Sequence, residues 1–192
     1  MKALLKRISK CNECAAHLPL GTNPILTAHP KSKLIIIGQA PGLIVHKSSI
    51  PWDDKSGNTL REWLQLPKTD FYNPEKVALL PMGFCYPGKG KSGDLPPRKE
   101  CAPQWHDKVL KLIENAELIV LIGKYAQDYY LGKRAKRTLT ETVRNFEDYL
   151  PEYLVLPHPS PRNNIWKAKN QWFEKEIIPV IQHIVKNLQL SE

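Results

Sequence analysis

Four short apolar runs set the fold that this chain can adopt. Each is rich in β-branched residues and is followed directly by Gly or Pro; they cover residues 34–37, 77–80, 118–122 and 153–156. Runs of this length and composition are typical of buried strands. Segments with helical spacing alternate with them, at residues 59–66, 98–115, 124–131 and 138–150. This alternation predicts an α/β fold, a three-layer α/β/α sandwich around a central, mostly parallel four-stranded sheet.

The length of the chain limits how many such units it can form. A chain of 192 residues has the size of one domain with its own core, and no linker or internal repeat divides it. We therefore expect residues 1–192 to form a single domain. Hydrophobic residues make up 42% and charged residues 24%, which excludes a disordered tail or a coiled coil. Residues 163–188 show one long helical pattern, which Pro179 should kink.

The apolar segments are too short for a membrane protein. None approaches the roughly 18 to 20 uninterrupted apolar residues of a membrane span. The first ten residues lack the apolar core and cleavage site of a secretion signal. We expect a cytoplasmic, monomeric protein with no membrane partner.

The charge balance points to a polyanionic partner. Lys and Arg number 28 against 19 Asp and Glu, a formal net charge of +9. Nucleic acid is therefore the first partner to test. Many soluble proteins of this size are simply basic, so composition alone leaves the partner open.

Three loops rich in Gly and Pro follow the first, second and fourth predicted strands. They are Gly-Gln-Ala-Pro-Gly at 38–42, Pro-Met-Gly-Phe-Cys at 81–85 and Pro-His-Pro-Ser-Pro-Arg-Asn at 157–163. The carboxyl ends of parallel strands meet at one edge of the sheet, where α/β proteins bind ligands. Any one of these loops fits ordinary turn chemistry, but three at one edge favour a preorganised pocket.

The four cysteines are candidate metal ligands. Cys11 and Cys14 form a Cys-x-x-Cys pair, and Cys85 and Cys101 are separated by fifteen residues. In a cytosolic chain such thiols are more often ligands than disulfides. Four thiolates suit either tetrahedral zinc or a four-iron four-sulfur (4Fe-4S) cluster. The spacing lacks the second close pair of a zinc ribbon and so favours iron and sulfur slightly. Four unrelated buried thiols are the remaining alternative.

Several of these motifs together resemble the uracil-DNA glycosylase superfamily. They are the loop 38–42, the stretch Pro-Trp-Asp-Asp-Lys-Ser-Gly at 51–57 with Leu60 beyond it, the four cysteines and the loop around His158. The resemblance is greatest to the iron-sulfur branch, often called family 4. The second motif, at 158–163, is more similar to the single-strand-selective uracil glycosylases.

The resemblance implies an activity and roles for individual residues. The chain would be a monofunctional DNA repair glycosylase that flips uracil or another deaminated base out of DNA and hydrolyses its N-glycosidic bond. His158 would donate to the developing base anion, and Gln39 would position water or the sugar. The implied base-binding residues are Gly38, Ala40, Trp52 and His158; the implied DNA-binding residues are Ser160, Arg162 and Asn163; and the implied ligands of a 4Fe-4S cluster, with zinc as the alternative, are Cys11, Cys14, Cys85 and Cys101.

The chain departs from the family 4 pattern at three places, which involve five residues. Gln39 stands where that branch has Glu, and Ala40 stands where other branches have Asp, so the loop has no carboxylate. Val45 and His46 replace residues that tend to be acidic. Pro81 stands where family 4 has the Asn that reads the uracil edge. These departures make a non-catalytic DNA- or base-binding member of the same fold the alternative function.

Overall fold

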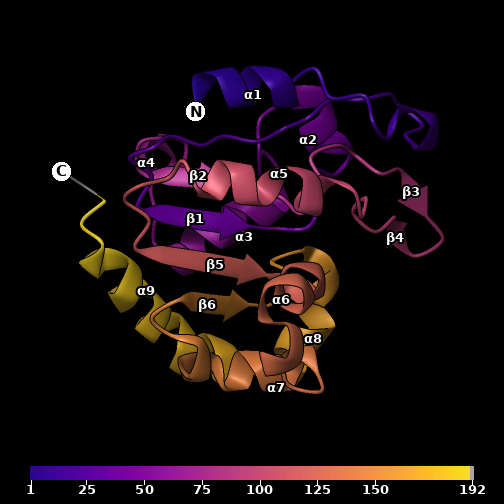
Figure 1. Cartoon of the computed structure of the whole chain (residues 1–192). Helices are drawn as coiled ribbons and strands as arrows, with labels where there is room; N and C mark the ends of the chain where they lie inside the picture. Colours follow the sequence, from indigo (N-terminus) through magenta and orange to yellow (C-terminus); the bar gives the residue numbers. More distant parts are fainter. Residues whose placement is uncertain (191–192) are drawn as a thin grey trace.

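A computed structural model describes residues 1–190, which form a parallel sheet covered by helices on both faces (Figure 1). The sheet has the order β2-β1-β5-β6, and each of its three strand pairs is parallel. Its strands are β1 Leu34–Ile37, β2 Val77–Leu79, β5 Leu118–Ile122 and β6 Tyr153–Leu156. The predicted α/β/α sandwich is confirmed, and the strands match the four apolar runs to within one residue.

Helices connect these strands and extend the chain at both ends. The α-helices are α1 Lys2–Ile8, α2 Leu43–Ser48, α3 Lys55–Leu64, α4 Lys68–Phe71, α5 Cys101–Leu110, α6 Gly123–Leu131, α7 Leu139–Arg144, α8 Asn164–Lys169 and α9 Ile178–Asn187. A small antiparallel hairpin, β3 Lys89–Gly90 and β4 Gly93–Asp94, stands apart from the sheet. No helix within residues 1–190 is long and apolar enough to cross a membrane.

The strands are continuously apolar because both faces of the sheet are covered. All four side chains of β1 are at most 1% exposed. Helices α1 and α5 contact each other on one face of the sheet, and helices α3 and α9 contact each other on the other face. A sheet covered on both sides has no solvent face, so its strands lose the alternation of apolar and polar residues. That is why the apolar runs located the strands so closely.

The order of the strands places a crevice at the carboxyl edge of the sheet. From β1 the chain passes through α3 to β2, whereas from β5, on the other side of β1, it passes through α6 to β6. Parallel crossovers are right-handed, so α3 and α6 cover opposite faces, as Figure 1 shows. The chain therefore leaves β1 and β5 toward opposite faces of the sheet. The crevice between the loops after these two strands is the topological switch point, where such folds bind ligands.

The predicted helices exist, but several bounds differ. The helix expected at 59–66 begins earlier, at Lys55, because Asp54 caps its amino end with Oδ1 accepting from the Gly57 amide at 2.9 Å. The helix expected at 98–115 is shorter and covers only Cys101–Leu110. The pattern at 138–150 divides into α7 and a 3₁₀ turn at Phe146–Tyr149.

The expectation of one long helix over 163–188 is wrong. Helix α8 ends before Asn170, whose backbone leaves the helical region and whose side chain donates to the Trp166 carbonyl at 2.8 Å. The chain then re-enters a helix through a wide π-helical turn, Phe173–Ile177, that continues into α9. Pro179 lies in the first turn of α9, and its missing amide N–H breaks the regular hydrogen-bond ladder at this point.

Candidate active site

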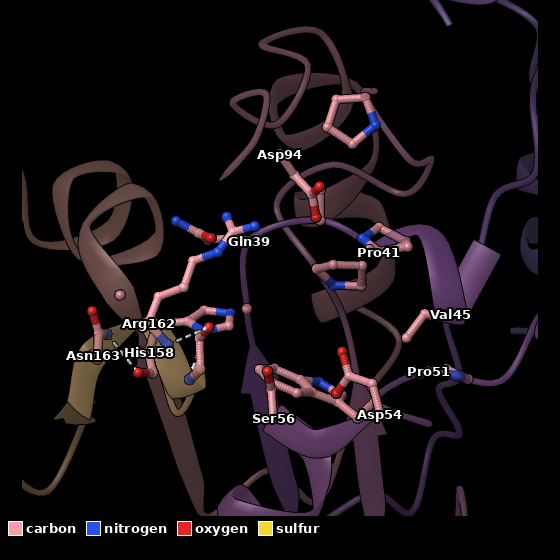
Figure 2. A pocket seen from close by; sticks show the side chains of 18 of the residues that line it. Gln39, Pro41, Val45, Pro51, Asp54, Ser56, Asp94, His158, Arg162 and Asn163 are labelled. Atoms are coloured by element: carbon pink, nitrogen blue, oxygen red, sulfur yellow. Dashed lines mark hydrogen bonds between the residues drawn. The ribbon is translucent and has the colours of Figure 1, made fainter. Parts of the chain in front are cut away.

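A cavity of about 490 Å³ opens at the switch point (Figure 2). It lies between the loops after β1, β5 and β6, with residues 51–56 along one side and the β3–β4 hairpin at its mouth. The predicted pocket is therefore present. All eight residues that the resemblance assigned to base, DNA or catalysis line it: Gly38, Gln39, Ala40, Trp52, His158, Ser160, Arg162 and Asn163.

Gly123 brings two of these residues together across the switch point. It begins α6 with a φ of 78°, and a Cβ there would lie 3.6 Å from His158 Cβ and 4.0 Å from Gln39 Cγ. Gly123 is thus within van der Waals reach of both the loop after β1 and the loop after β6. Gln39 and His158 consequently border the same cavity although 119 positions separate them in sequence.

The local hydrogen bonds of His158 fix which ring nitrogen carries its proton. The amide N–H of Ser160 donates to Nδ1 of His158 at 3.2 Å, so Nδ1 is an acceptor. In a neutral imidazole the proton is then on Nε2. The Asn163 amide group donates to the His158 carbonyl at 2.7 Å and holds the loop in this shape. The site therefore presents a neutral Nε2–H donor.

Burial keeps His158 neutral. Desolvation lowers the pKa of His158 from its ordinary value of 6.5 to about 4, because the charged imidazolium loses water at the bottom of the cavity. Burial also lowers the pKa of His106 to about 4, although its hydrogen bond with the Pro81 carbonyl acts in the opposite direction. At neutral pH both rings are uncharged.

These two pKa values predict a loss of stability in mild acid. The unfolded chain takes up a proton on each histidine near pH 6.5, whereas the folded chain resists protonation until about pH 4. The two histidines therefore leave the free energy of unfolding unchanged above about pH 7. They lower it as the pH drops toward 4, by at most about 3 kcal/mol per histidine.

Denaturant unfolding of the wild type and His158→Gln at pH 7.5 and 4.5 tests this pH dependence. The variant should lose less stability on acidification, and an equal loss would contradict a buried neutral His158.

Trp52 forms one wall of the cavity in an unusual backbone conformation. Its φ is 58°, a left-handed value that is uncommon for a bulky residue. Its indole packs against the His158 ring with centroids 5.7 Å apart and planes inclined by 29°. The Tyr72 hydroxyl donates to the Trp52 carbonyl at 3.2 Å, and Arg61 donates to that hydroxyl at 3.1 Å. Tyr72 and Arg61 thus support the strained turn from below.

Two glycines allow Trp52 to sit there. A Cβ at Gly38 would lie only 2.6 Å from Cζ2 of the indole. A Cβ at Gly57 would collide with the Trp52 carbonyl oxygen, which is backbone and cannot move aside. Both positions therefore require glycine for close approach rather than for an unusual φ.

The loop after β1 is held by the loop after β2. The Gly38 and Gln39 carbonyls accept from the amides of Met82 and Gly83, each at 2.9 Å. Ala40 contributes only a methyl group, so the loop itself offers the cavity no carboxylate. Pro81 also lines the cavity.

The two remaining departures from the family pattern lie apart from each other. Val45 lines the cavity, whereas the His46 ring packs against Tyr86 with centroids 5.9 Å apart. The His46 side chain therefore packs against Tyr86 and is not among the residues that line the cavity.

Two carboxylates to which the sequence assigned no role also reach the cavity. Asp54 comes from the amino end of α3, next to Ser56, and Asp94 comes from the end of β4. Figure 2 shows Asp54 near Ser56 and Asp94 on the opposite side of the cavity. Asp54 belongs to the motif at 51–57, whereas no local sequence signal distinguished Asp94, which only the tertiary fold brings to the switch point.

The residues after His158 have contacts within their own loop. The Ser160 hydroxyl accepts from the Arg162 amide at 3.3 Å and caps the 3₁₀ turn at Pro161–Asn163. The Arg162 guanidinium donates to the Ser92 carbonyl in the β3–β4 hairpin at 3.4 Å. These contacts fix the loop, and the predicted DNA contacts of Ser160, Arg162 and Asn163 stay predictions.

The four cysteines meet at a second, small cavity beside the carboxyl end of β2. Cys11, Cys14, Cys85 and Cys101 all line it and all are free thiols. Burial raises the pKa of Cys14 and Cys85 and raises that of Cys101 to about 12. Within residues 1–190, no three His, Cys, Asp or Glu side chains form a group that could hold a single metal ion.

A doubly wound α/β domain with a polar cavity at its switch point is typical of ligand-binding proteins. Comparison with known proteins identifies the family within this class. The family model described as the uracil DNA glycosylase superfamily matches residues 26–182. The chain belongs to this superfamily.

Two individual comparisons gave the following similarities. The chain is 24% identical over 163 residues to the Type-4 uracil-DNA glycosylase of Thermotoga maritima, covering 83% of this chain and 81% of that protein. A solution NMR structure of a Methanosarcina acetivorans protein, described as a candidate uracil DNA glycosylase, matches 84% of this chain and 98% of its own at 15% identity, with a TM-score of 0.46.

Proposed function

We propose that this chain is a monofunctional DNA repair glycosylase that hydrolyses the N-glycosidic bond of uracil or another deaminated base flipped into the cavity. One observation carries the proposal. His158 is neutral, and its bond from the Ser160 amide leaves Nε2–H as a donor. A fixed donor in the lining of a cavity is what a departing base anion requires. Membership of the superfamily and similarity to a Type-4 uracil-DNA glycosylase support the same reaction class.

The proposed reaction needs three contributions from the protein. Trp52 stacks on the base and excludes water from its face. His158 Nε2–H donates to the base oxygen on which negative charge develops as the C1′–N bond breaks. Gln39 lies beside the sugar, and its amide orders the attacking water by donating and accepting hydrogen bonds. With Pro81 in place of an amide side chain, the base edge must be read by other groups, and Ser56 lines the cavity with a hydroxyl.

DNA is the proposed partner of a cytoplasmic monomer. The net charge of +9 favours a polyanion, and Arg162 lies at the mouth of the cavity, where a phosphate beside a flipped nucleotide would pass. Ser160 and Asn163 shape the same loop and would contact the backbone through their polar groups. Such contacts fix the register of the strand without reading its sequence.

A 4Fe-4S cluster is the proposed cofactor, with zinc as the alternative. Cys11, Cys14, Cys85 and Cys101 supply the four thiolates that such a cluster needs, and they line one cavity. A cluster takes one thiolate on each of its four irons, so four cysteines match the number of ligands it needs. When bound it would be structural, linking the amino-terminal segment to the loop after β2 and the start of α5. Metal binding deprotonates thiols, so it would offset the raised pKa values.

Base release from defined oligonucleotides tests the function. Single- and double-stranded oligonucleotides carrying one uracil, hypoxanthine or xanthine are incubated with the metal-replete protein, and abasic sites are revealed by alkaline cleavage. Release that depends on His158 supports the glycosylase and names the base. Tight binding with no release from any lesion would instead favour a non-catalytic DNA- or base-binding protein, for which Ala40 and Pro81 are the motivating observations.

A further inference from the structure

A carboxylate lies at the cavity mouth although the loop after β1 has none. Asp94 is the last residue of β4 and lines the same cavity as Gln39 and His158 (Figure 2). Its Oδ2 lies 3.4 Å from the position that a Cβ at Gly42 would occupy. The carboxylate therefore rests against the loop at 38–42, beside which the proposed function places the sugar.

Of the two carboxylates in the cavity, Asp94 is the one with both oxygens free of hydrogen bonds. Oδ1 of Asp54 already accepts the Gly57 amide as the cap of α3. The Asp94 carboxylate forms no hydrogen bond or ion pair within the described part of the chain, and it is exposed at the cavity. A carboxylate with all its acceptor positions free can bind and deprotonate a water molecule.

The hairpin that carries Asp94 is fastened to the loop that carries His158. Lys89 pairs with Asp94 and Gly90 with Gly93 across the two short strands. The Arg162 guanidinium lies directly against Gly93 and donates to the Ser92 carbonyl at 3.4 Å. The contact of Arg162 with the hairpin limits how far Asp94 can move relative to the loop that carries His158, and catalysis requires such positioning.

We propose that Asp94 is the catalytic general base of this chain and replaces the carboxylate that the loop after β1 lacks. A water molecule between Asp94 and the sugar attacks C1′ and gives one proton to the Asp94 carboxylate. The new O–C1′ bond forms as the C1′–N bond breaks, and that electron pair leaves on the base. The base anion is held by His158 Nε2–H and takes its proton from solvent. This inference rests on the proposed glycosylase function.

Single-turnover base release by Asp94→Asn tests the inference. The rate should fall by about 100-fold, within the range that a positioned general base contributes. DNA affinity, measured by fluorescence anisotropy, should be unchanged or higher, because the substitution removes a negative charge near the backbone. Asp148→Asn is the matched control, since it removes a carboxylate that pairs with Lys136 on the surface at 2.7 Å. That control should keep the wild-type rate.

A rescue experiment separates catalysis from a structural role. Asp94→Ala supplemented with formate should regain part of the lost rate, because formate supplies a carboxylate in the vacated space, whereas a damaged hairpin would not respond. If the wild type releases a base and Asp94→Asn releases it at the same rate, the assignment of Asp94 is overturned and the glycosylase function stands. Loss of rate in Asp54→Asn instead would assign the base to Asp54. A wild type that releases no base would overturn the glycosylase and the Asp94 role together.

Discussion

Replacing His158 by alanine should lower the rate of base release by about 1,000-fold. A preorganised donor to a developing anion commonly contributes two to three orders of magnitude, because it acts where water is excluded. His158 meets both conditions, since its Nδ1 is bound by the Ser160 amide and its pKa is lowered by burial to about 4. Single-turnover release from a uracil oligonucleotide measures the effect.

Ser160→Ala is the control for this prediction. The Ser160 hydroxyl accepts only the Arg162 amide at 3.3 Å, and the amide that holds His158 is backbone and survives the substitution. A neutral hydrogen bond contributes about 1 kcal/mol, so release should fall by no more than about 5-fold. Equal small losses in the two variants would contradict the role of His158.

The positions of the strands could be predicted because local composition decides them. Residues 34–37 and 153–156 are buried on both faces and carry apolar side chains throughout, so no other element competes for them. The pocket was also predictable, since the loops at 38–42 and 157–163 follow parallel strands whose carboxyl ends meet at one edge. These inferences use only neighbouring residues and the rules of parallel sheets.

The rest of the site depends on contacts between distant segments. Asp94 lies in a two-residue strand within a segment rich in Lys and Gly, which carries no periodic signal. The left-handed backbone of Trp52 depends on Gly57 and on Tyr72, which lie outside its own turn. The break at Asn170 is local, but the apolar positions on both sides of it keep a helical spacing and so concealed it. Sequence patterns identify elements, whereas tertiary packing selects the side chains that meet.

Replacing any one of the four cysteines should abolish formation of a 4Fe-4S cluster. Each of Cys11, Cys14, Cys85 and Cys101 would supply one ligand, so every single Cys→Ala variant should bind little iron and acid-labile sulfide. A group bound only by the folded state adds to its stability. In a chain of this length about 1 kcal/mol shifts the Tm by about 2–4 °C, and loss of several kcal/mol should lower the Tm by about 10 °C or more.

The comparison between Cys11→Ala and Cys101→Ala decides whether the thiols act as ligands or only as buried side chains. Cys101 is 7% exposed, whereas Cys11 is half-buried. If the thiols only fill space, Cys101→Ala should cost about 1 kcal/mol and Cys11→Ala almost nothing, because the cost of truncation follows burial. If they hold a cluster, the two variants should lose the same iron and nearly the same stability despite their different burial. Zinc in place of iron and sulfide, at one ion per chain, would retain the ligand role and change only the metal.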